Sequence, residues 1–305
     1  MKCNIFLILS PFILIGSLKF SLFLIVYLSL ILNQKIFSFN RNLEILIVTF
    51  HSKILLMLLG VFSYKYKFKK QNFKREPNLI FSTQSSIIDW LILMNNYCPK
   101  FLYIVKSNDN KNDYFIEISY FEVFSIGSGN KFLSKEKYKN KFNIENYLKN
   151  SSKKPLVIFP ENTKTNKQGV LNIRSNLMDD IYNIIQKNED KILLRSEIIV
   201  NLNNDINTIF SNGLKSIFNL CKNLFIEIYI YSQDISNNIF NDNDIQYDKK
   251  KFKNFNEFLD YNLQELLMEP NHRNVVSLNC LDHKKFIEYY QKTNADKKAN
   301  YIKKD

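Results

Sequence analysis

The sequence predicts an α/β domain with a mostly parallel sheet flanked by helices, preceded by an N-terminal helical segment that associates with a membrane. Residues 5–32 are almost continuously apolar. From about residue 78, short apolar runs of strand length alternate with segments at helical spacing. Hydrophobic residues make up 46% and charged residues 23% of the 305 positions, which suits a folded chain. We therefore expect membrane-anchoring segments at 1–70, an α/β domain at 71–245 and a basic helical tail at 246–305.

The first apolar segment is long enough to cross a bilayer, because a spanning helix needs roughly 20 apolar residues at about 1.5 Å each. Lys19 lies in its middle, where a charge costs about 2.5–3.5 kcal/mol on insertion scales. A tilted span and a re-entrant hairpin that bends near Gly16 are both open. A cleaved signal peptide is disfavoured by the length of the run and the lack of a small-residue cleavage site.

A second apolar segment, residues 43–63, contains enough polar side chains to predict an interfacial or packed helix rather than a span. Aromatic residues and lysines then alternate over 64–76. This pattern is typical of an edge strand that lysines protect from further pairing. It equally suits a basic stripe that meets anionic lipid headgroups. Both interpretations can hold together.

The net charge of +13 rests almost wholly on lysine, since five of the 42 basic residues are arginine. Such a chain binds nucleic acid, an anionic membrane or acidic small molecules. No nucleic-acid-binding module is recognisable, so we expect no nucleic acid partner. The four cysteines are far apart, which indicates neither a disulfide framework nor a metal site.

Strands are predicted within the body of the chain at six apolar runs: 79–81, 101–105, 156–159, 192–194, 198–202 and 224–231. Helices are predicted at 173–187, 206–220 and 255–268. In parallel sheets, sites form where strands give way to loops at their carboxyl ends. Two such ends are informative: "TQSSIID" (83–89) follows the first strand, and "PENTK" (160–164) follows the third.

The segment "LVIFPENTK", followed by Gly169, resembles the FPEGTR block of the glycerolipid acyltransferases, the superfamily of lysophosphatidate (PlsC-type) acyltransferase. "TQSSIID" lies where that superfamily has its NHxxxxD block, and "KFLSK" (131–135) lies where it has an Arg. The chain most resembles the divergent fungal lysophosphatidic acid:oleoyl-CoA acyltransferase branch, in which the first block lacks the His. The resemblance covers most of residues 10–235.

The resemblance implies transfer of an acyl group from acyl-CoA, a co-substrate rather than a bound cofactor, to the hydroxyl of a lysophospholipid. Asp89 stands at the position of the superfamily's Asp and Gln84 at that of its catalytic His. The residues that correspond to its phosphate-binding positions are Lys135, Glu161, Asn162, Thr163 and Lys164. Lysine in place of arginine keeps the charge and loses the bidentate geometry. No metal is implied.

Gln84 is the serious departure, because an amide accepts no proton near neutral pH and loss of a general base costs about 10²–10⁴ in rate. Asp89 could act as the base, the acceptor's phosphate could take the proton, or the protein could bind lipid without turnover. His51, His272 and His283 are poor replacements on sequence grounds. The acidic pair Asp179–Asp180 is expected to be solvated.

The expected function is therefore synthesis of phosphatidic acid from lysophosphatidic acid and acyl-CoA. The alternative is a non-catalytic protein of the same fold that binds anionic lipid. The expected location is the endoplasmic reticulum membrane, with the lipid droplet as a second site and the catalytic domain in the cytosol.

Overall fold

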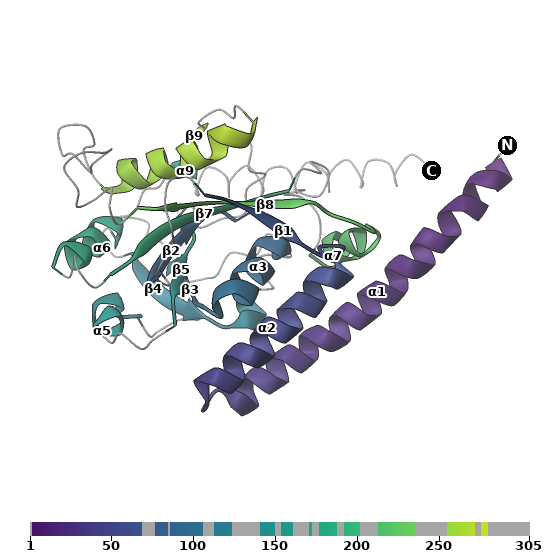
Figure 1. Ribbon diagram of the computed structural model, residues 1–305, viewed down its shortest axis with the longest axis horizontal. Helices are drawn as coiled ribbons and strands as arrows, with labels where there is room; N and C mark the ends of the chain where they lie inside the picture. The colour runs from purple at the N-terminus through teal and green to yellow at the C-terminus, as the bar shows by residue number, and fades with distance from the viewer. Residues whose placement is uncertain are drawn as a thin grey trace, which may run out of the picture.

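Helices cover both faces of one seven-stranded sheet in the computed structural model of this chain (Figure 1). The structure describes residues 2–68, 77–84, 86–105, 113–123, 141–149, 154–160, 171–172, 177–187, 192–201, 213–235, 255–271 and 276–279. The helices are α1 (Lys2–Phe37), α2 (Arg41–Leu58), α3 (Ile87–Tyr97), α5 (Ile144–Leu148), α6 (Leu177–Gln186), α7 (Gly213–Cys221) and α9 (Phe255–Asn271). The strands are β1 (Tyr64–Phe68), β2 (Leu79–Ser82), β3 (Lys100–Val105), β4 (Tyr114–Ile118), β5 (Leu156–Ile158), β6 (Leu171–Asn172), β7 (Leu194–Asn201), β8 (Ile228–Asp234) and β9 (Val276–Asn279).

The large sheet has the strand order β1-β8-β7-β2-β5-β3-β4, and β6 and β9 form a separate pair. β2 runs parallel to both of its neighbours, β5 and β7. β3 is parallel to β5, and β1 is parallel to β8. The β3–β4 and β7–β8 pairs are antiparallel. The predicted α/β class with a mostly parallel sheet is confirmed.

The central strands are buried on both faces, which explains why they appear in the sequence as unbroken apolar runs. Ile80 and Val157 contribute to a core that also contains side chains of α1, α2, α3 and α7. Phe81 and Ile158, their neighbours in sequence, point to the other face and pack with α5, α6 and α9. The alternation of side chains along each strand therefore builds two cores from one sheet.

The N-terminal segments form an antiparallel pair of helices that belongs to the first of these cores. α1 is continuous for 36 residues, about 54 Å at about 1.5 Å per residue. The alternative of a hairpin that bends near Gly16 is wrong, because the chain turns only at residues 38–40. Asn40 caps α2 by accepting hydrogen bonds from the N–H groups of Asn42 and Leu43. Phe23 and Leu30 of α1 and Leu55 of α2 are fully buried.

The predicted strands at 192–194 and 198–202 are one strand, β7. Arg195, Ser196 and Glu197 interrupt the apolar pattern there, yet all three are buried within the sheet. The strand predicted from residue 224 begins only at Ile228, and Leu224 lies exposed in the preceding loop. The antiparallel strand β4 was not predicted at all.

The edge position of β1 confirms one of the two interpretations of the alternating segment. β1 closes the sheet beside β8, with Lys65 and Lys67 exposed and Tyr64 and Tyr66 partly buried on the opposite face. The α/β domain was predicted to span residues 71–245. The sheet begins before residue 71, and α9, which lies after residue 245, packs on β7 and β8. The division of the chain into domains remains a prediction.

Candidate functional site

The two motif-bearing segments leave the sheet side by side. β2 and β5 are parallel neighbours, with Phe81 paired to Ile158. The chain leaves β2 through Thr83 and Gln84, and leaves β5 through Phe159 and Pro160. Because the carboxyl ends of parallel strands open at one edge of a sheet, these two turns start at adjacent positions.

The turn after β2 leads directly into α3, and Asp89 has a defined structural role there. Its Oδ2 accepts a hydrogen bond from the backbone N–H of Ser86 at 3.0 Å. The Ser86 Oγ in turn accepts from the N–H of Ile88 at 3.2 Å, so the two residues form a capping box. Asp89 is 2% exposed and sits in the first turn of the helix, where the helix dipole favours a negative charge. Its carboxylate is therefore held at the strand–helix turn.

Gln84 is buried beside this cap, with 1% of its surface exposed. The start of α3 rests on aromatic side chains of the neighbouring strands. The Trp90 ring lies 4.7 Å from that of Phe101 and 4.3 Å from that of Phe159, centroid to centroid. Such packing keeps Gln84 and Asp89 on a rigid, apolar base.

The structure places only part of the predicted site. Gln84 and Asp89 lie in the described turn, and their proposed roles remain predictions. The predicted phosphate-binding positions all lie outside the described residues: Lys135, Glu161, Asn162, Thr163 and Lys164.

The histidines also divide between described and undescribed segments. His272 and His283 fall outside the described ranges, whereas His51 belongs to α2 and its side chain contacts α1. The Nε2 of His51 is 3.1 Å from Ser29 Oγ, and its Nδ1 is 2.8 Å from the carbonyl oxygen of Ile47. His51 is thus a packing residue, as its sequence context indicated.

A polar network that sequence reasoning missed lies under the far end of α3. Glu197 of β7 is fully buried and pairs in register with Ser82, the last residue of β2. Its Oε1 accepts hydrogen bonds from the hydroxyls of Tyr97 and Ser232, and Arg195 Nη1 lies 3.7 Å away. Burial raises the pKa of Glu197, and it also raises the pKa of Tyr97. The signal in the sequence was the polar triplet 195–197 inside an apolar strand.

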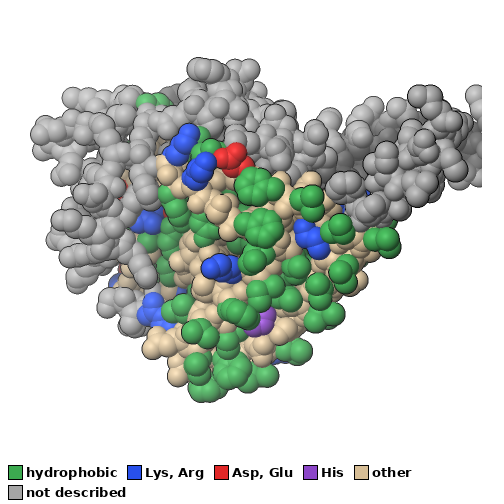
Figure 2. Space-filling model, turned by 45° about the vertical axis from the view of Figure 1, so that its right-hand side comes forward, with side chains coloured by type: hydrophobic (Ala, Val, Ile, Leu, Met, Phe, Trp, Pro, Cys, Tyr) green, Lys and Arg blue, Asp and Glu red, His purple; other side chains and the backbone are tan. Residues whose placement is uncertain are grey.

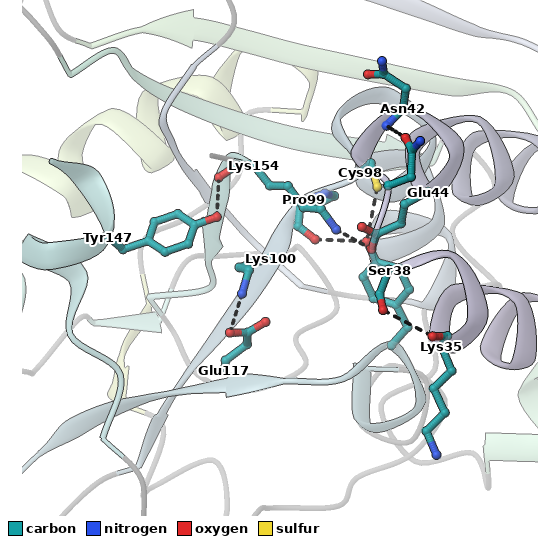
Figure 3. Close-up of polar contacts among 12 residues, drawn as sticks. Lys35, Ser38, Asn42, Glu44, Cys98, Pro99, Lys100, Glu117, Tyr147 and Lys154 are labelled. Carbon is teal, nitrogen blue, oxygen red and sulfur yellow. Dashed lines mark hydrogen bonds and ion pairs between the residues drawn. The ribbon is translucent and has the colours of Figure 1, made fainter. Parts of the chain in front are cut away.

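A pocket of about 580 Å³ lies at the opposite end of the strands, where β3 and β5 begin. Lys100 forms an ion pair with Glu117 at 2.8 Å, and Lys154 pairs with the buried Glu44 of α2 (Figure 3). The Tyr147 hydroxyl donates to the carbonyl of Lys154 at 3.0 Å (Figure 3). The Lys154–Glu44 pair attaches the first turn of α2 to the amino end of β5. The pocket is not the predicted site, which belongs to the carboxyl ends.

Within the described part of the chain, no group of three or more His, Cys, Asp or Glu side chains is placed to hold a metal ion. No protein-family model matches the sequence, and no curated protein matches it. Among solved structures, the chain is similar to the crystal structure of the 1-acyl-sn-glycerophosphate (LPA) acyltransferase PlsC from Thermotoga maritima. The TM-score is 0.48 and the identity 10%, over 86% of this chain and 98% of that chain.

Proposed function

We propose that this protein is a membrane-associated acyltransferase that transfers a fatty acyl group from acyl-CoA to the hydroxyl of a lysophospholipid, with lysophosphatidic acid as acceptor. The observation that carries the proposal is the adjacency of β2 and β5. The two segments that resemble the superfamily's motifs are about 70 residues apart in sequence, and yet the turns that begin them leave the same edge of the sheet. This arrangement is what a shared cleft for hydroxyl and phosphate requires.

In this proposal the acceptor oxygen attacks the thioester carbonyl, an ester bond forms, and the thiolate of coenzyme A leaves. The hydroxyl proton needs an acceptor. Gln84 can orient the hydroxyl by hydrogen bonding, but its amide cannot take the proton. The proton therefore goes to the Asp89 carboxylate or to the phosphate of the acceptor itself. Lys135 and Lys164 are proposed to hold that phosphate as point charges, together with the turn formed by Glu161, Asn162 and Thr163.

The N-terminal helices supply the membrane association. Within the described residues, one segment, Ile13–Phe37, is long and apolar enough to cross a membrane, with a mean hydropathy of 2.1. One side of this segment is exposed, including Leu18, Ile25 and Leu32, while Phe23 and Leu30 on the other side are buried in the core of the sheet. Because Phe23 and Leu30 pack this part of α1 against the domain, the helix cannot be surrounded by lipid there, and we propose that α1 and α2 lie along the bilayer surface. The endoplasmic reticulum and the lipid droplet are the proposed locations.

A non-catalytic lipid-binding role is the second candidate, and the amide at Gln84 favours it. The two are separated by supplying labelled oleoyl-CoA and lysophosphatidic acid to purified protein in lipid nanodiscs. Wild-type protein should form labelled phosphatidic acid, Asp89→Asn should lose this activity, and Gln84→His should increase it if the site retains its geometry. Equal background in all three, with lysophosphatidic acid still bound, would exclude the enzyme and support the binding protein.

A further inference from the structure

Two loops next to α1 are held side by side, and both carry exposed apolar side chains. The N–H of Ile226, in the loop after α7, donates to the carbonyl of Gly60, in the loop after α2, at 2.8 Å. The Nζ of Lys19 in α1 donates to the carbonyl of Asn223 at 2.7 Å. The loop after α7 is therefore fixed from two sides. Leu224 and Phe225 at its tip are nevertheless exposed, because no described residue packs over them.

The side chains that project from this fixed position are large and apolar. Leu224 and Phe225 are each 58% exposed, Phe62 is 55% exposed and Leu214 at the start of α7 is 58% exposed. We name these four residues the α7 ledge. In the described part of the chain, the exposed large apolar side chains all come from α1, α2, the loops at their ends, the segment after β4, and this ledge. The ledge thus adds exposed apolar side chains beside the helix pair, and large exposed apolar side chains gathered in this way indicate an interaction surface.

The charges around the ledge select the partner. Residues 53–67 and 213–227 contain five lysines (Lys53, Lys65, Lys67, Lys215 and Lys222) and one acidic residue, Glu227. Lys65 pairs with Glu227 at 3.1 Å, and the Nζ of Lys67 lies 4.8 Å from the Tyr229 ring. Figure 2 shows apolar side chains over one face, with basic side chains scattered among them and basic side chains beside an acidic one at their upper border. Apolar side chains interspersed with lysines match the acyl and headgroup layers of an anionic bilayer.

We propose that the α7 ledge is a second membrane contact, which inserts Leu224, Phe225, Phe62 and Leu214 into the interface of an anionic bilayer while the surrounding lysines bind lipid phosphate or carboxylate groups. This inference rests on the proposed membrane association of α1 and α2, and it adds a function to it. A pair of helices lying on a surface can still roll about its long axis. A contact beside that axis stops the roll and fixes the distance between the turn at Gln84 and the bilayer.

The test measures partition of full-length protein onto vesicles of phosphatidylcholine alone and of phosphatidylcholine mixed with phosphatidylserine. Lys65→Gln/Lys67→Gln should lower partition onto the mixed vesicles by about 25-fold, at about five-fold per lysine, with no change on the neutral vesicles. The effect should shrink at high salt. Lys149→Gln is the control, because Lys149 is similarly exposed and ion-paired but caps α5 on the other face of the sheet, and it should change neither value.

A second pair of variants tests insertion directly. Leu224→Ser/Phe225→Ser should lower partition onto both kinds of vesicle by about 10-fold or more, because apolar area leaves the bilayer. In Phe225→Trp, brominated lipid should quench a new fluorescence signal above that of Trp90, which is buried. The proposed contact would be overturned if both double variants bound vesicles as strongly as the wild type and the tryptophan in Phe225→Trp were not quenched. Since α1 and α2 would still bind vesicles and acyl transfer would still be measurable, that failure differs from failure of the proposed function. If Lys65→Gln/Lys67→Gln lowered partition equally onto neutral and anionic vesicles, the proposed binding of these lysines to anionic headgroups would be overturned.

Discussion

Gly60 and Gly16 approach the loop after α7 equally closely, yet alanine should destabilise the protein only at Gly60. A Cβ atom at Gly60 would lie 2.9 Å from the backbone oxygen of Asn223. A Cβ at Gly16 would lie 2.9 Å from Cγ of the Lys222 side chain. The distances match, but only a side chain can move aside without moving the backbone.

The free energies follow from the two environments. Gly60 has a φ of 92°, where a residue with a Cβ is strained by about 1–2 kcal/mol. Moving the Asn223 carbonyl would also loosen the hydrogen bond from Ile226 to Gly60, worth about 0.5–1.5 kcal/mol. Gly60→Ala should thus lower the free energy of unfolding by about 2–3 kcal/mol. Gly16→Ala gains about 1 kcal/mol of helix propensity and costs about 1 kcal/mol to turn Lys222, which leaves little net change.

Thermal unfolding of the full-length variants in mild detergent checks this, with fluorescence of the single tryptophan, Trp90, as the probe. Gly60→Ala should lower Tm by several degrees, at roughly 2–4 °C per kcal/mol. Gly16→Ala should stay within a degree or two of wild type by the same conversion. A loss for Gly16→Ala as large as that for Gly60→Ala would refute the reasoning, because it would show that the side chain of Lys222 cannot yield.

Three further outcomes are expected. Asp89→Asn and Ser86→Ala disturb the same capping box, so each should lower the free energy of unfolding by about 1 kcal/mol. The rate of acyl transfer should fall about 100-fold or more only in Asp89→Asn. Equal rates in the two variants would leave Asp89 with a capping role alone. Burial raises the pKa of Glu197 above its ordinary value of 4.5, so its contribution to stability is present at lower pH and is lost as pH rises from 4.5 through the folded pKa. Glu197→Gln should flatten that decline in urea unfolding measured against pH, and an unchanged slope would assign it to another group. Asp179 Oδ1 accepts from the first N–H of α9 at 3.1 Å, so Asp179→Ala should cost about 1 kcal/mol in the same urea assay and the exposed neighbour Asp180→Ala nearly nothing.

The strands that could be predicted are those whose environment is uniform. Apart from Lys100 at the start of β3, the residues of β2, β3 and β5 are buried, so apolar side chains are favoured at almost every position of these strands. β7 contradicts that pattern because Arg195 and Glu197 are buried with polar partners from α3 and β8. Those partners are distant in sequence, so no local window contains the information. Asp179 was predicted to be solvated for the same reason, since the helix that it caps begins 76 residues later.

The candidate site could be predicted only as two turns. Their order along the chain and their position after apolar strands were in the sequence, whereas the pairing of β2 with β5 was not, because strand order is a property of the whole sheet. The capping role of Asp89 was also hidden. A Ser-x-x-Asp spacing before an apolar run is compatible with a helix cap and with a catalytic carboxylate, and here the same side chain is proposed to do both.

Lys19 shows why hydropathy could not decide between a spanning helix and a packed one. In a span, its charge would lie near the bilayer centre at a cost of about 2.5–3.5 kcal/mol. In the structure its Nζ instead donates to the carbonyl of Asn223, just beyond the end of α7, where the helix dipole favours a positive charge. The lysine therefore lies on the side of α1 that packs against the loop after α7. One side of α1 meets the sheet core, and the exposed side is the one proposed to meet the bilayer. Both environments favour apolar residues, so the helix is apolar on all sides.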